Sequence, residues 1–303
     1  MRRPLELRRR DGTAPVRWLL AGLVVLALTA PSGPVQATLR APAGPDRPPA
    51  TAPNATPSAG ATVTRLGGFD RFETAAIFAH ATFAAPVATV YLADGLGFAD
   101  GLAGAAAAAT AGAPLLLTDP DALPSDTAAE LGHLHPAHLV VLGSQASVSD
   151  AVARAAAALS GAAITRLAGT DRFATAAATS AATDPVGVAT VVVADGLAFP
   201  DALAGAAAAG HLHGPLLLVT PTSIPPATAL ELVRLHPGGI IVLGSEASVG
   251  DAVLGALAAF TTGSVTRRAG ADRYATAVAL STATYPSATT VYLADGLAFP
   301  DAL

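Results

Sequence analysis

Short runs of apolar residues alternate along most of the chain with longer segments in which apolar residues recur at helical spacing. In the first stretch of this kind the predicted strands are Val63–Leu66, Thr89–Ala93, Leu115–Thr118 and His138–Leu142. The predicted helices follow them at residues 70–84, 100–111, 124–134 and 149–159. Nearly continuous apolar strands joined by helices indicate a parallel sheet with helices on both faces. The predicted fold class is therefore α/β, with small Rossmann-like parallel-sheet modules.

The same order of elements returns along the chain, so we predict tandem modules. The motif that contains Asp70 and Arg71 recurs around Asp171 and again around Asp272, at intervals of 101 residues. The predicted boundaries are a repeat at 62–163, a second repeat at 164–264 and a partial third repeat at 265–303. Because the third repeat holds two strands and one complete helix, we expect the chain to be a fragment of a longer protein.

The segment before the repeats has the features of an export signal. Residues 1–37 combine six arginines with an apolar run of 13 residues, Trp18–Ala30, and the small-residue cleavage site Val35–Ala37. The run is short for a membrane span, although an uncleaved anchor is the alternative interpretation. Residues 38–61 are rich in Pro and Ala and are predicted to form a linker. We therefore expect a secreted protein of the cell wall or cell surface, and the arginines leave Sec and twin-arginine export open.

Composition excludes several classes of function. The absence of Cys excludes a disulfide scaffold, a Cys-ligated zinc site and a thiol nucleophile. The 17 basic residues are all Arg, and the formal net charge of −5 argues against nucleic acid as a partner. No apolar segment after the signal is expected to span a membrane.

Candidate binding residues gather where the predicted strands end, because ligands of parallel α/β sheets bind beyond the carboxyl ends of the strands. Seven of the nine arginines after the linker lie in three R-x-x-G-x-D-R motifs. Arginine in the first turn of a helix suits phosphate or carboxylate, and a pair with a neighbouring Asp is the alternative. The acidic residues at the loop edges are Asp94, Asp100, Asp195, Asp201, Asp295 and Asp301. Each Asp could equally cap a helix, as Asp70 is predicted to do.

Catalytic and metal-binding interpretations have less support in the sequence. The recurring Asp pairs could serve glycoside hydrolysis, although helix capping explains them better. His133, His135 and His138 lie close in sequence, but the sequence shows no complete set of ligands for a metal ion. No metal and no cofactor is therefore predicted.

The motifs, taken in order, resemble the cell-wall-binding repeat type 2 family of Gram-positive surface proteins. The resemblance covers about 62–303 and rests on R-x-x-G-x-D-R-[FY]-x-T-A, A-D-G-x-x-[FP]-D-A-L, the P-L-L-L-T strand and the strand ending in L-G-S. It implies α/β modules that assemble in threes into a pseudo-threefold block, within one chain or between chains. It also implies non-covalent anchoring to anionic secondary polymers of the wall, often beside a separate effector domain.

The family's binding motifs can be placed on this chain residue by residue. The resemblance implies polymer-binding residues at Arg65, Asp70, Arg71, Arg166, Asp171, Arg172, Arg267, Asp272, Arg273, Leu115, Leu116, Leu117, Leu216, Leu217 and Leu218. The third repeat lacks the three-leucine strand, and no effector domain is visible. We therefore predict a non-catalytic protein that binds an anionic cell-wall polysaccharide. A secreted hydrolase of wall glycans and a self-associating surface-layer protein are the alternatives.

Overall fold

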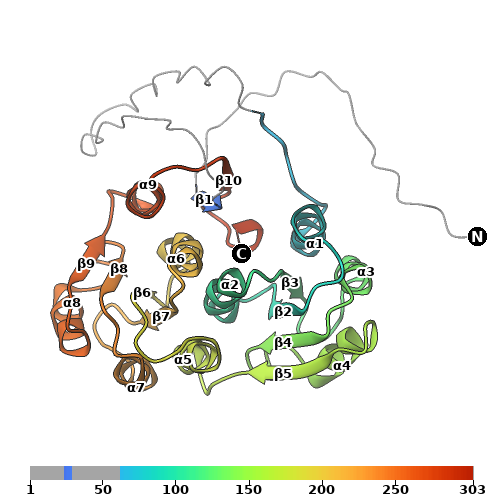
Figure 1. The fold of residues 1–303 in the computed structure, drawn as a ribbon, viewed down its shortest axis with the longest axis horizontal. Helices are drawn as coiled ribbons and strands as arrows, with labels where there is room; N and C mark the ends of the chain where they lie inside the picture. Colours follow the sequence, from blue (N-terminus) through green and yellow to red (C-terminus); the bar gives the residue numbers. More distant parts are fainter. Residues whose placement is uncertain (1–23, 29–61, 303) are drawn as a thin grey trace, which may run out of the picture.

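Two four-stranded parallel sheets, with helices on both faces, make up most of the described chain (Figure 1). The computed structural model describes residues 24–28 and 62–302. The predicted linker, 38–61, and the predicted signal peptide, apart from its residues 24–28, lie outside the described residues. The α/β fold class and the tandem arrangement are confirmed.

The first sheet has the strand order β3-β2-β4-β5. Its strands are β2 (Thr89–Asp94), β3 (Leu115–Thr118), β4 (His138–Leu142) and β5 (Ala163–Leu167), and the helices around it are α1 (Arg71–Thr82), α2 (Ala99–Ala111), α3 (Ser125–Leu134) and α4 (Asp150–Ala158). Alternate residues of β2 enter different clusters. Val90 and Leu92 pack with α3 and α4, whereas Tyr91 and Ala93 pack with α2. This alternation explains why the buried strands are apolar on both faces.

The second sheet repeats this topology in the order β7-β6-β8-β9. Its strands are β6 (Val191–Asp195), β7 (Leu216–Val219), β8 (Ile240–Leu243) and β9 (Val265–Arg268). The helices are α5 (Arg172–Thr183), α6 (Pro200–His211), α7 (Pro226–Leu235) and α8 (Asp251–Leu257), followed by the 3₁₀ turn η1 (Ala258–Phe260).

Each sheet crosses a boundary between sequence repeats. Strand β5 opens the second repeat but pairs with β4 of the first, and β9 opens the third repeat but pairs with β8 of the second. The corresponding segment of the first repeat, Val63–Leu66, was predicted as a strand, and this prediction is wrong because 62–68 form no strand. Strand β5 forms by pairing with β4, whereas 62–68 pair with none of the described strands, so their backbone forms no ladder.

The third repeat contributes α9 (Arg273–Thr284), β10 (Thr290–Ala294) and the 3₁₀ turn η2 (Pro300–Ala302). Strand β10 pairs antiparallel with β1 (Val24–Leu28). Helix α9 packs against α6, and Leu280 on it belongs to the same buried cluster as the alanines of α6.

Small residues let the inner helices approach one another and the sheets. Helices α2 and α6, both rich in Ala, share one buried cluster. A Cβ added at Gly104 would overlap the Leu142 side chain, and one at Gly205 would lie 2.5 Å from Leu243 Cδ1. The close packing of Ala-rich helices on the sheet therefore depends on these two glycines. Among the described residues, no helix has the length and apolar character needed to cross a membrane.

Candidate functional site

Equivalent loops of the three repeats meet near the centre of the structure. Each loop follows β2, β6 or β10 and carries one phenylalanine. The rings of Phe98, Phe199 and Phe299 form a triangle, with every pair of ring centroids 5.9 Å apart. The third repeat therefore packs against both earlier repeats at this point.

The arginines in the first turns of α1, α5 and α9 pack against the three phenylalanine rings. Each guanidinium lies over the phenylalanine ring of a different repeat, at 5.3–5.8 Å from the centroid. Each also donates from Nη1 to the carbonyl oxygen of a loop glycine at 2.6–2.9 Å. The three sets are Arg71 with Phe299 and Gly95, Arg172 with Phe98 and Gly196, and Arg273 with Phe199 and Gly296. A guanidinium has five N–H donors, so this bond leaves donors for a ligand.

The aspartates that precede these arginines cap helices, as predicted for Asp70. The Asp70 carboxylate accepts from the backbone N–H groups of Phe72 and Glu73, at 2.8 and 2.9 Å. Asp171 and Asp272 each accept from one backbone N–H group in the first turns of α5 and α9. Their role as caps follows from geometry and does not exclude contact with a ligand.

The other motif arginines have different surroundings. Arg166 donates to the carbonyl oxygens of Gly143, Ser144 and Val148 and to the Asp150 carboxylate, at 2.8–3.2 Å. Arg267 makes the equivalent bonds after β8, to the carbonyls of Gly244 and Val249 and to Asp251. Arg65 lies in the exposed segment before α1. Arg166 and Arg267 therefore hold the loops that follow β4 and β8.

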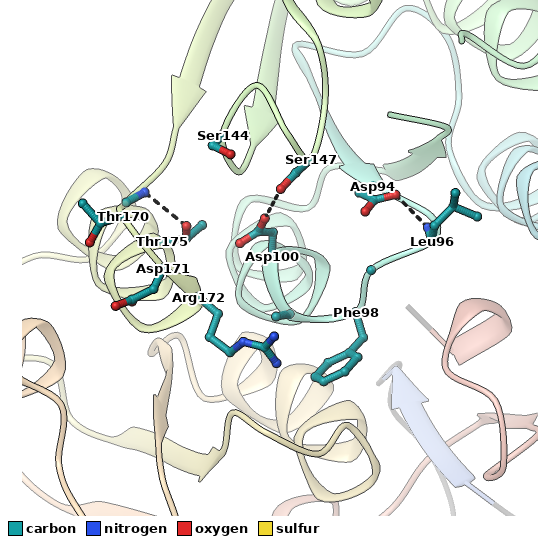
Figure 2. A pocket seen from close by; sticks show the side chains of 13 residues that line it. Asp94, Leu96, Phe98, Asp100, Ser144, Ser147, Thr170, Asp171, Arg172 and Thr175 are labelled. Carbon is teal, nitrogen blue, oxygen red and sulfur yellow. Dashed lines mark hydrogen bonds between the residues drawn. The ribbon is translucent and has the colours of Figure 1, made fainter. Parts of the chain in front are cut away.

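A cleft of about 370 Å³ opens between the first and second repeats, and we call it the first junction cleft. The loops after β2 and β4 form one side, and the loop that joins β5 to α5 forms the other. Figure 2 shows Asp94, Asp100, Ser147, Asp171 and Arg172 around it, with Arg172 directed toward Phe98. The equivalent second junction cleft, of about 240 Å³, lies between the second and third repeats and includes Asp201, Ser248, Asp272 and Arg273. The sequence motifs thus form one kind of cleft twice.

Hydrogen bonds from nearby donors hold the carboxylates of the first junction cleft in place. Asp94 Oδ1 accepts from the N–H of Leu96 at 2.7 Å, and Asp100 Oδ2 accepts from the Ser147 hydroxyl at 2.7 Å. Burial raises the pKa of Asp94, and the neighbouring charges of Asp100 and Asp119 raise it further, whereas hydrogen bonds from two backbone N–H groups lower it.

The later repeats keep most of this geometry. Burial and the charge of Asp201 raise the pKa of Asp195, which accepts from the N–H of Leu197 at 2.9 Å. Asp201 accepts from the Ser248 hydroxyl at 2.9 Å. Asp295 accepts from the N–H of Leu297 at 2.8 Å, and Asp301 is exposed in η2.

The leucine strands occupy a different part of the molecule from the clefts. Leu115–Leu117 form most of β3 and Leu216–Leu218 most of β7, and five of these six side chains are 0–1% exposed. A polymer on the surface does not reach such side chains. By contrast, Leu96, Leu197 and Leu297 are 55–59% exposed, and Leu96 lines the first junction cleft. Their recurrence in the A-D-G-L motif was a signal that the sequence analysis did not use.

The junction clefts combine groups that suit a polyhydroxylated, charged ligand. The Asp carboxylates accept hydrogen bonds, Ser and Thr hydroxyls donate or accept them, and Arg contacts an anion. Exposed Leu96 adds apolar surface to the first junction cleft.

Comparisons with known proteins agree with this description. Residues 65–153 and 166–254 each match the family Cell wall binding domain 2 (CWB2). The chain is 29% identical over 242 residues to N-acetylmuramoyl-L-alanine amidase LytC of Bacillus subtilis (strain 168), covering 80% of this chain and 47% of the relative. It is 28% identical over 214 residues to the amidase enhancer of the same organism, covering 71% of this chain and 28% of the relative. The chain thus spans less than half the length of these relatives.

Two solved structures from Clostridium difficile are also similar. Cwp6 gives a TM-score of 0.68 at 26% identity, with 77% of this chain and 38% of that chain covered. Cwp8 gives a TM-score of 0.63 at 25% identity, with 71% and 36% covered.

Proposed function

Because this chain belongs to the Cell wall binding domain 2 (CWB2) family, we propose that it binds an anionic secondary polymer of the bacterial cell wall through its junction clefts, without catalysing a reaction on it. Family membership itself indicates cell-wall binding and a location at the wall or cell surface. The polymer class, the binding residues and export by the N-terminal segment are parts of the proposal.

The repetition of the cleft is the observation that carries the proposal. Both junctions present Asp, Ser, Thr and Arg from equivalent motif positions, which fits a ligand with repeating units. Binding at several equivalent sites raises overall affinity without new kinds of contact. A single-substrate enzyme has no need of this repetition.

Charge decides which groups contact which part of the polymer. In the first junction cleft Asp94, Asp100 and Asp171 outnumber Arg172, so the cleft as a whole does not attract an anion. We assign the anionic groups of the polymer to the remaining Arg172 donors and its sugar hydroxyls to the carboxylates. Exposed Leu96 fits the apolar face of a sugar ring. Salt should weaken the Arg contact and leave the hydroxyl contacts.

Thr170 provides the sharpest test, because it is exposed in the first junction cleft and precedes the Asp171 cap. Thr170→Glu adds a negative charge and removes none of the contacts that hold Arg172. The matched control is Thr262→Glu, at an exposed position before the amino end of β9, whereas the second junction cleft lies beyond its carboxyl end.

Co-sedimentation with purified walls measures the effect. One wall sample is intact, and the other is stripped of anionic polymers. We expect binding to intact walls only, weaker at high salt, reduced by Thr170→Glu and unchanged by Thr262→Glu. Equal binding to both samples, or equal binding by both variants, would contradict the proposal.

The alternative of a glycan hydrolase has one observation in its favour. Asp94 and Asp195 have raised pKa values and lie near second carboxylates, as a general acid does. Release of soluble sugar from walls by the purified chain, abolished by Asp195→Asn with Asp201→Asn, would establish it. Assembly of the chain in the absence of walls would instead favour the surface-layer alternative.

A further inference from the structure

Two histidines and a buried glutamate meet on the outer side of the first repeat, away from the junction clefts. His80 lies in the last turn of α1, and Glu130 and His133 lie three residues apart on α3. One potential ligand atom from each of these residues lies within 4.8 Å of the others. The sequence analysis did not join them, because His80 is 50 residues from Glu130.

Glu130 has an unsatisfied oxygen in this cluster. The residue is 6% exposed, and its Oε2 lies 3.2 Å from His80 Nδ1. Its Oε1 is buried and has no hydrogen-bond partner among the described residues. A buried carboxylate oxygen without a partner is costly, so this oxygen points to a missing ligand.

The second repeat shows how the same position is satisfied without a ligand. Glu231 is the equivalent of Glu130, and Arg234 is the equivalent of His133. Arg234 donates to both oxygens of Glu231 at 2.7 and 2.8 Å, and the Ser180 hydroxyl donates to Oε1 at 2.6 Å. The first repeat has His133 where the second has Arg234, and it has His80 where the second has Ala181.

We propose that His80, Glu130 and His133 bind a divalent transition-metal ion of the zinc type. Two imidazoles and one carboxylate are a ligand set that zinc accepts, with water in the fourth position. Ligands about 2.0–2.1 Å from a tetrahedral ion lie about 3.3 Å apart, which matches the 3.2 Å between His80 and Glu130. His133 is exposed and can close the remaining gap by a rotamer change.

The ion would join α1 to α3, and binding by both carboxylate oxygens of Glu130 would also satisfy its free Oε1. Calcium and magnesium prefer oxygen ligands, so imidazole nitrogen selects against them. The proposal is independent of wall binding, because these residues line neither junction cleft.

Equilibrium dialysis of the chain, purified without a histidine tag, against zinc chloride tests the proposal. We expect one zinc ion per chain to bind with an affinity that His133→Arg lowers by more than the roughly 10–100-fold typical of outer-shell changes. This variant places the arginine of the second repeat at position 133, so we expect it to donate to Glu130 and to keep the fold intact. The matched control is His138→Arg, at an exposed position outside the cluster.

Thermal unfolding with and without zinc gives a second measurement. Zinc should raise the melting temperature of the wild type and of His138→Arg, and it should leave His133→Arg unchanged. Cobalt substitution should give the visible absorption of a four-coordinate ion in the wild type and in His138→Arg, and should not give it in His133→Arg. No uptake by folded wild type, or equal uptake by His133→Arg, would overturn the proposal and leave an ion pair between His80 and Glu130.

Discussion

Gly143, in the loop that supplies Ser144 and Ser147 to the first junction cleft, should be costly to replace. It follows β4 with φ of +85°, and a Cβ built there would overlap Asp100 Oδ2 and lie 2.7 Å from Ser147 Oγ. Gly143→Ala therefore imposes backbone strain and also drives Asp100 away from Ser147. The clash adds about 1–3 kcal/mol, the usual range for overpacking.

Gly112→Ala separates the cost of backbone strain from the cost of the clash with Asp100. Gly112 ends α2 with φ of +61°, and nothing lies within 4 Å of its would-be Cβ. Both variants carry the left-handed strain of about 1–2 kcal/mol, so their difference isolates the contact with Asp100.

Thermal unfolding followed by circular dichroism measures that difference. At about 2–4 °C per kcal/mol for a structure of this size, Gly143→Ala should melt roughly 2–12 °C below Gly112→Ala. Asp100→Ala combined with Gly143→Ala should recover part of the loss, because the overlapping carboxylate is gone. Equal melting of the two glycine variants, or no coupling between positions 100 and 143, would refute the reasoning.

Three further predictions concern stability and use the same unfolding measurement. Thr228→Val should cost about 1–3 kcal/mol, because the buried hydroxyl donates to the carbonyl of Leu218 at 2.7 Å and its loss leaves that oxygen unpaired. Arg166→Lys should cost about 1.5–3 kcal/mol, because one ammonium cannot reproduce the guanidinium fork; an unchanged melting temperature would contradict its role. Burial raises the pKa of Tyr285 to about 12. The unfolded state then loses this proton first, so stability should fall between about pH 10 and 12, and Tyr285→Phe should remove that part of the fall.

Local pattern was enough to predict most elements of the fold. The apolar runs at Thr89–Ala93 and Leu115–Thr118 form strands, and Asp70 forms a cap, because each depends on neighbours in sequence. The predicted strand at Val63–Leu66 failed for the opposite reason. Its residues have strand-forming character, but a strand also needs a partner, and the pattern does not say which strand supplies it.

The candidate site was predictable only in part. The loop positions of Asp94 and Arg172 followed from the rule that ligands bind at the carboxyl ends of parallel strands. The partners did not follow: Arg172 stacks on Phe98 of another repeat, and His80 meets Glu130 through the packing of α1 on α3. Such pairs depend on how modules and helices pack against one another, and the spacing of apolar residues along the sequence does not predict this packing.

The sharing of strands between repeats has a consequence for how such a chain can be lengthened or recombined. A cut at the sequence boundary near residue 163 would separate β5 from β4 and expose the edge of the sheet. A shifted period, 71–167 or 172–268, keeps each sheet whole with the helices that cover it. Gene duplication by such shifted units would add modules without passing through an intermediate with an open, aggregation-prone edge.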